Sequence, residues 1–107
     1  MINEFTVKVR VRPDDINAGC HNAVGCAWNR AAIRAIKRRF RRWEIRNIGT
    51  SHRDTDIAQR LPDNYLGRKF RCSHPQEVVD WIGRFDNGDK VEPFEVEATF
   101  SVWDFPC

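Results

Sequence analysis

The chain has 107 residues, which is room for one domain with a modest hydrophobic core, and we expect a single domain over residues 1–107. Its 41% hydrophobic and 11% aromatic content is too high for a disordered chain, and no apolar run approaches the length of a membrane span. The net charge is only +3, but residues 1–72 carry sixteen Lys or Arg against seven Asp or Glu, whereas residues 73–107 carry two against eight.

The N-terminal residues and the cysteines indicate a cellular compartment. Residues 1–11 contain Glu4, Lys8 and Arg10 and lack the apolar stretch of a secretory signal peptide. The cysteines stand at the irregular positions 20, 26, 72 and 107, unlike the pattern of a disulfide-stapled secreted domain. We therefore expect reduced thiols and a location in the cytoplasm.

Residues 5–12 alternate strictly between apolar and polar side chains, which predicts a half-buried strand. Its apolar face consists of Phe5, Val7, Val9 and Val11. Pro13 ends the strand, and Asp14 or Asp15 can cap a short helical turn that runs to about residue 18.

The most basic segment of the chain follows, because residues 30–46 hold eight Lys or Arg and a single acidic residue, Glu44. Apolar residues recur through it at spacings of three and four: Trp28, Ala32, Ile33, Ile36 and Phe40. At about 100° per residue these side chains fall on one side of a helix and the basic ones on the other. The pattern predicts an amphipathic helix from about residue 24 to residue 40, with a cationic outer face.

The second half of the chain predicts four more elements. Residues 43–48, 65–72 and 94–102 favour strands, and residues 75–86 favour a helix with an apolar stripe. The polar segment 50–63 between the first two strands is ambiguous. Eight side chains are expected in the core: Trp28, Ile36, Phe40, Val78, Ile82, Phe85, Phe94 and Phe100.

The element order β-α-β-β-α-β predicts an α+β fold of ferredoxin-like type, an antiparallel sheet with two helices on one face. In that arrangement the first and last strands lie side by side and antiparallel. Lys8 and Arg10 on one strand would then face Glu95 and Glu97 on the other, and this charge match supports the expected pairing.

Two motifs stand out. One is Asp-Ile-x-x-Gly at residues 15–19, followed by Cys26 at the start of an Ala-rich helix. The other is Phe-Asp-x-Gly-x-x-Val-x-Pro-Phe at residues 85–94. Together they resemble a family of small uncharacterised proteins encoded by bacteriophages and by bacterial genomes with prophages. The family has no established activity, so the resemblance implies only a setting, that of a phage accessory protein in the bacterial cytoplasm.

Five residues could supply ligands to zinc: Cys20, His21, Cys26, Cys72 and His74. For a common zinc motif, Cys20 and Cys26 are too far apart in the sequence, and Cys72 and His74 are too close together. Buried thiols at Cys26 and Cys72 are the favoured interpretation, and we expect no bound metal.

His52, Asp54 and Asp56 would share one face of a strand, where they could hold a divalent metal or transfer a proton. The same composition is typical of a solvated polar loop, which is the favoured interpretation. No Ser-His-Asp or Cys-His grouping has a supporting local motif. We therefore expect no catalytic residue, no cofactor and no enzymatic activity.

The outer face of the basic helix is the predicted binding site: Arg30, Arg34, Lys37, Arg38, Arg41 and Arg42. Arg outnumbers Lys seven to one in this segment, which suits bidentate contact with carboxylates or phosphates. The alternative is a solvated helix face, partly paired with Glu77 and Asp80 of the second helix.

The leading hypothesis is a phage-type accessory protein that binds a macromolecule with an acidic surface through this helix. A protein partner comes first, such as a host defence or regulatory factor that the chain would inhibit. A nucleic acid comes second, and a small metal-dependent enzyme or zinc module comes third.

Overall fold

Eight helices and strands make up the described part of the chain, residues 3–18, 26–51, 53–62 and 66–104 of a computed structural model. In chain order they are β1 (Asn3–Val11), α1 (Pro13–Ala18), α2 (Ala27–Arg39), β2 (Glu44–Thr50), β3 (Asp54–Arg60), β4 (Leu66–Ser73), α3 (Gln76–Asp86) and β5 (Phe94–Asp104). The strands form one sheet in the order β1-β5-β4-β3-β2, and every neighbouring pair is antiparallel. The α+β class is confirmed.

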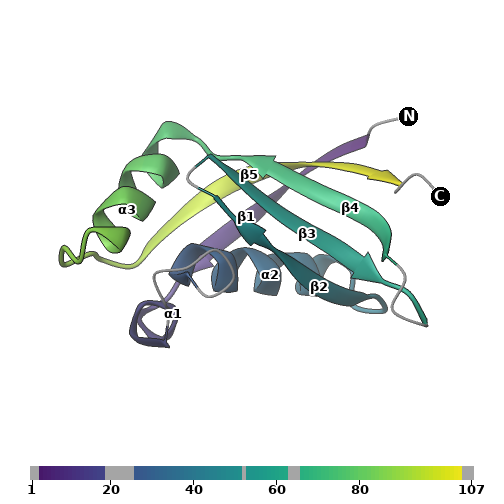
Figure 1. The fold of residues 1–107 in the computed structure, drawn as a ribbon, viewed down its shortest axis with the longest axis horizontal. Helices are drawn as coiled ribbons and strands as arrows, with labels where there is room; N and C mark the ends of the chain where they lie inside the picture. The colour runs from purple at the N-terminus through teal and green to yellow at the C-terminus, as the bar shows by residue number, and fades with distance from the viewer. Residues whose placement is uncertain (1–2, 19–25, 52, 63–65, 105–107) are drawn as a thin grey trace.

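The helix α2 lies along one face of this sheet (Figure 1). It packs against β1 and β2, which are the two edge strands, and against β3. Because α2 contacts both edge strands, it spans this face of the twisted sheet from one edge to the other.

The core lies between the sheet and α2, and the apolar side of α3 extends it. Six of the eight side chains expected there are buried: Trp28, Ile36, Val78, Ile82, Phe85 and Phe100. The other two, Phe40 and Phe94, are half-buried and pack against the margin of the cluster. The ring of Phe70 lies at the centre of an aromatic group, 5.2 Å from Phe40, 6.0 Å from Phe5 and 6.1 Å from Trp43 between ring centroids.

The pairing of the first and last strands is confirmed. β1 runs antiparallel to β5, with Lys8 opposite Glu97 and Arg10 opposite Glu95. The ammonium nitrogen of Lys8 also lies 4.0 Å from a carboxylate oxygen of Glu95. These pairs are exposed, so each contributes only about 0.2–1 kcal/mol, but together they favour this register over a slipped one.

The ferredoxin-like topology is not confirmed, because the ambiguous polar segment forms an additional strand, β3. Thr55, Ile57 and Ala58 of this strand are fully buried. The extra strand reverses β4, which now runs in the same direction as β1, and β5 lies between them antiparallel to both. β1 is therefore an edge strand instead of a central one.

The position of α3 also differs from the expected pair of helices side by side. α3 lies at the end of the sheet where β4 ends and β5 begins, away from the length of α2 (Figure 1). β4 and β5 are antiparallel neighbours, so their connection stays at one end of the sheet. In a ferredoxin-like fold this helix would join parallel strands and would have to run back along the sheet.

The packing of Phe70 gives the first prediction. Replacing Phe70, which is fully buried, with Ala should lower the free energy of unfolding by about 3–5 kcal/mol, because its three aromatic neighbours Phe5, Phe40 and Trp43 cannot close the cavity. Phe70→Leu should cost much less, since most of the volume is kept. Urea denaturation followed by Trp fluorescence measures both. A loss below about 1 kcal/mol for the Ala variant would show that the site collapses and is not central to the core.

Candidate functional site: a cationic surface beside the edge strand β2

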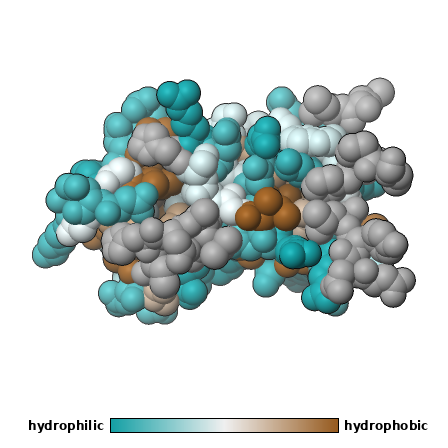
Figure 2. All heavy atoms as spheres, in the orientation of Figure 1, coloured by the Kyte–Doolittle hydropathy of each residue, from teal (hydrophilic) through white to brown (hydrophobic). Residues whose placement is uncertain are grey.

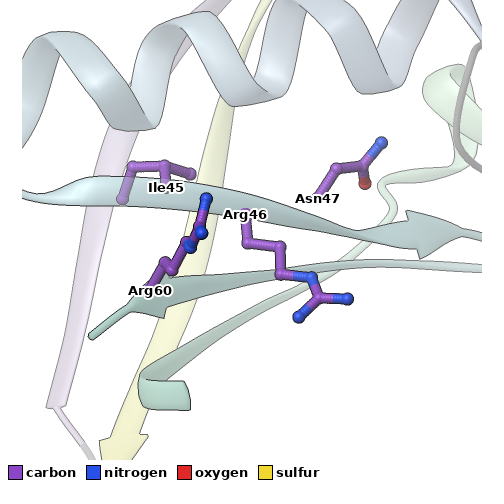
Figure 3. A pocket seen from close by; sticks show the side chains of 4 residues that line it. All are labelled: Ile45, Arg46, Asn47 and Arg60. Carbon is purple, nitrogen blue, oxygen red and sulfur yellow. The ribbon is translucent and has the colours of Figure 1, made fainter. Parts of the chain in front are cut away.

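Two adjoining hollows open where the C-terminal end of α2 meets β2. One, of about 600 Å³, is lined by Ile45, Arg46, Asn47 and Arg60 (Figure 3). The other, of about 380 Å³, is lined by Lys37, Arg41, Trp43, Glu44, Ile45 and Arg60. Ile45 and Arg60 line both, so the two hollows adjoin, and we refer to them together as the depression.

Alternation along β2 places side chains on both sides of this depression. Figure 3 shows Ile45 and Asn47 on the side of β2 that faces α2, and Arg46 on the other side. Arg60 is the last residue of β3, opposite Glu44, and its side chain extends toward β2. Cations from α2, β2 and β3 thus surround the half-buried Ile45.

The outer edge of β2 borders the same depression. Within the described residues, no strand pairs with β2 on the side away from β3. An edge strand carries a row of backbone N–H and C=O groups that no other strand satisfies. Because consecutive side chains of a strand point to opposite faces, the hollow lined by residues 45, 46 and 47 has side chains from both faces of β2 in its lining.

Four of the six residues in the predicted site surround the end of α2 with exposed side chains: Lys37, Arg38, Arg41 and Arg42. No ion pair is found for any of these four within the described part of the chain. With the exposed Arg46 and Arg60 they form what we call the α2–β2 cationic surface: Lys37, Arg38, Arg41, Arg42, Arg46 and Arg60. Neighbouring Arg39 differs from them, because its guanidinium lies over the rings of Phe5 and Phe40.

The expectation that Arg34 is a free surface cation is wrong. Its two terminal nitrogens donate to the carboxylate of Asp15 at 2.9 and 2.7 Å, and one of them also donates to the carbonyl oxygen of Arg10 at 2.8 Å. The Arg34 side chain is 32% exposed and the Asp15 side chain is 1% exposed. This bidentate pair ties α2 to α1 and to the end of β1.

Arg30 is intermediate between Arg34, which is paired with Asp15, and the exposed cations that have no ion pair. Its side chain is 46% exposed, and its Nε lies 3.8 Å from the same Asp15 carboxylate. A separate hollow of about 460 Å³ opens here, lined by Asp15, Asn29, Arg30, Ile33, Arg34 and Lys37. Lys37 borders this hollow as well as the depression at β2.

The alternative that acidic residues of α3, the second predicted helix, neutralise the cations of α2 is not supported. Gln76 donates to the carboxylate of Asp80 at 2.9 Å, within α3 itself. No ion pair joins Glu77 or Asp80 to α2 in the residues that the structure describes. This follows from the position of α3 at the end of the sheet.

The three candidate metal ligands within the described residues, Cys26, Cys72 and His74, do not belong to a metal-binding cluster there. Cys26 and Cys72 are buried, and Cys26 Sγ accepts a hydrogen bond from the backbone N–H of Asn29 at 3.3 Å, which caps α2. No cluster of three or more His, Cys, Asp or Glu suited to a metal occurs among the described residues. Cys20 and His21 lie outside the described residues.

The alternative of an acid–base or metal group at His52, Asp54 and Asp56 gains no support from the two described residues, and the favoured loop is instead part of the strand β3. Asp56 accepts two hydrogen bonds from Arg71, at 2.7 and 3.2 Å, and Asp54 accepts one from Ser73 at 3.4 Å. His52 lies outside the described residues. The two carboxylates on β3 are thus engaged in cross-strand contacts with β4.

A buried chain of hydrogen bonds lies at the N-terminal end of α2, at the other end of β2 from the site. Thr55 Oγ1 accepts from Trp28 Nε1 at 2.8 Å and lies 2.6 Å from His74 Nε2 and 3.2 Å from Thr50 Oγ1. Asn29 Nδ2 in turn donates to Thr50 Oγ1 at 2.7 Å. These contacts satisfy polar groups where α2 packs on β2 and β3, so they hold the helix in place.

The face of the molecule seen in Figure 2 is mainly hydrophilic, and its apolar atoms lie in small separate patches. Among the described residues only two large hydrophobic side chains are exposed, Ile48 and Leu61. Ile48 belongs to β2 and Leu61 directly follows Arg60 at the end of β3, so the surface around β2 combines its charges with isolated apolar side chains.

Comparison with known proteins adds no family. The chain matches no protein-family profile, no curated protein and no solved structure. None of the helices in the described segments is long and apolar enough to cross a membrane.

Acid should destabilise the fold through Asp15. Burial raises the pKa of Asp15, but the hydrogen bonds from Arg34 and from the Arg12 amide, with the charges of Arg34 and Arg30, bring it below its ordinary value of 3.8. Stability from this pair is complete above that value and is lost as the pH falls through the lower folded pKa. Asp15→Asn should therefore lower the free energy of unfolding at pH 7 by about 2–3 kcal/mol. It should also reduce the loss of stability that the native protein shows as the pH falls, which we call the acid limb of the stability curve.

Urea denaturation of both proteins between pH 2.5 and pH 7 measures this difference. The exposed neighbour Asp14 supplies a matched control, and Asp14→Asn should keep the acid limb of the native protein. If the difference in free energy of unfolding between the native protein and Asp15→Asn stays constant across this pH range, the ion pair does not stabilise the fold.

The two buried cysteines should be inert in the native protein. Burial raises the pKa of both thiols, that of Cys72 to about 12 with a contribution from the charge of Asp54, so neither forms a thiolate at pH 8. Iodoacetamide at pH 8 should leave Cys26 and Cys72 unmodified and should label both in urea. Peptide mass spectrometry reads each position separately, and rapid labelling of either one in the folded protein contradicts the assignment.

Proposed function

We propose that this protein binds a macromolecular partner with an acidic surface, in the first place another protein, through the α2–β2 cationic surface. The observation that carries the proposal is the set of exposed cations on α2 and its C-terminal side, Lys37, Arg38, Arg41 and Arg42, which have no carboxylate partner in the described part of the chain. Two of them, Lys37 and Arg41, line a depression that can admit side chains of a partner.

Folding does not account for this collection of charges. Exposed ion pairs contribute only about 0–1 kcal/mol, and unpaired like charges repel one another. The dipole of α2 favours Lys37, Arg38 and Arg39 in its last turn. It does not extend to Arg41, Arg42 and Arg46, which lie beyond the helix. A partner that supplies carboxylates would relieve the repulsion and form bidentate contacts with the Arg side chains.

The mixed character of the depression favours a protein over a nucleic acid. Glu44 lies among the cations, where it would repel a phosphate backbone, and the half-buried Trp43 and Ile45 offer apolar contact. Protein interfaces commonly combine Arg, aromatic side chains and charges of both signs. Nucleic acid is the second candidate, because the Arg-rich composition also suits phosphate.

The setting that we propose is that of a phage accessory protein acting in the bacterial cytoplasm, where it would inhibit a host defence or regulatory factor by occupying an acidic surface. This function needs no catalytic residue and no cofactor. The proposal rests on the motifs at residues 15–19 and 85–94 together with the cationic surface.

Charge reversal tests the proposal. The triple variant Arg38→Glu, Arg41→Glu and Arg42→Glu should lose more than tenfold of its retention of partner proteins from nuclease-treated bacterial lysate. Its free energy of unfolding should stay within about 1 kcal/mol of the native value, since exposed charges contribute little to folding. Quantitative mass spectrometry of the retained proteins and urea denaturation give the two measurements.

The matched control reverses three exposed cations elsewhere, Arg53→Glu, Arg84→Glu and Lys90→Glu, for the same change in net charge. It should retain the same proteins as the native chain. Duplex DNA in a salt titration tests the second candidate, because phosphate contacts give affinity that falls steeply with salt. Full retention by the first variant, or equal loss in the control, contradicts a specific cationic site.

A further inference from the structure

We infer that the partner binds as an extended acidic segment that adds a sixth strand to the sheet along the outer edge of β2. This inference rests on the proposed function and names the form of the partner at the same site. In this mode backbone hydrogen bonds supply affinity, and side-chain pockets supply selectivity.

The first support is the edge itself. β2 ends the sheet order, and none of the described residues adds a strand beyond it. The β-bulge between Asn47 and Gly49 disturbs only one end of β2, so Glu44 to Asn47 keep regular pairing with β3 and a regular outer edge. The depression adjoins this part of β2, because Ile45, Arg46 and Asn47 all line it.

The second support is the distribution of charge on the two sides of the edge. The side chains of an added strand would alternate, as those of β2 do. Those on the helix side would meet Lys37 and Arg41, and those on the other side would meet Arg46. Cations on both sides favour an acidic segment. An extended peptide that bears carboxylates matches the cations by its charge and the edge of β2 by its backbone.

The same charges disfavour a second copy of this chain. Pairing β2 with another β2 would bring the cations of two such surfaces together, where opposed like charges are destabilising. A nucleic acid could meet the cations but has no peptide backbone to pair with the edge. The strand-addition mode therefore separates an acidic protein segment from both.

Alternate N-methylation of a peptide tests this mode directly. The probe is a fluorescein-labelled octapeptide of alternating Glu and Val, measured by fluorescence anisotropy. Alternate N–H groups of a strand point to opposite sides, so one N-methylation pattern blocks the groups that face β2 and the complementary pattern blocks those that face solvent. One pattern should lose more than tenfold in affinity, and the other should stay within about threefold of the unmethylated peptide.

Equal affinity of the two methylated peptides, whether both strong or both weak, overturns strand addition. Amide hydrogen exchange gives a second measure, since β2 amides on the outer edge should exchange more slowly when the unmethylated peptide is bound. Unchanged exchange along β2 with the peptide bound also overturns the inference. If Arg38→Glu, Arg41→Glu and Arg42→Glu abolishes partner retention while both methylated peptides bind equally, the proposed function stands and strand addition does not.

Discussion

The ion pair between Asp15 and Arg34 separates the cations of α2 that are neutralised within the fold from those that are not. It joins α1, the end of β1 and α2, and the Asp15 carboxylate is almost completely buried. Asp15 pairs with Arg34 and lies 3.8 Å from the Nε of Arg30, so the charges that it offsets are those of these two residues. The short helix α1 offers its buried carboxylate to the N-terminal half of α2 only, so the basic residues after Arg34 project without a carboxylate from that side.

Strong periodicity made most of the fold predictable. The alternation over residues 5–12 and 94–102, the apolar stripes of the two long helices and the charge match between the outer strands each correspond to an observed element. β3 was not predicted because Asp54, Asp56 and Gln59 hide an alternation whose buried members are Thr55 and Ile57. That strand sets the direction of β4, so the order of the sheet could not be derived without it.

The candidate site shows the same division between local and distant information. The exposed cations around the end of α2 follow from helical spacing, which is local. The position of Arg34 depends on Asp15, nineteen residues away, and that of Arg60 depends on a strand pairing that the polar segment concealed. Arg46 lay in the recognised basic stretch, but its place beside an open sheet edge required the strand order. Charge patterning therefore located the region, and tertiary contacts decided its membership.

The pairing of β1 with β5 has a consequence for biosynthesis. Within the described residues β1 pairs with no strand other than β5, and its partners run from Phe94 to Val102, close to the other end of the described chain. Such long-range contacts incur a loop-closure entropy that local hairpins avoid, and they form late. During translation β1 stays unpaired until β5 has been synthesised, whereas β2, β3 and β4 can already pair as successive hairpins. A ribosome that stalls before Phe94 would release a chain in which one side of the core is uncovered, and this intermediate is the form most open to chaperones and proteases.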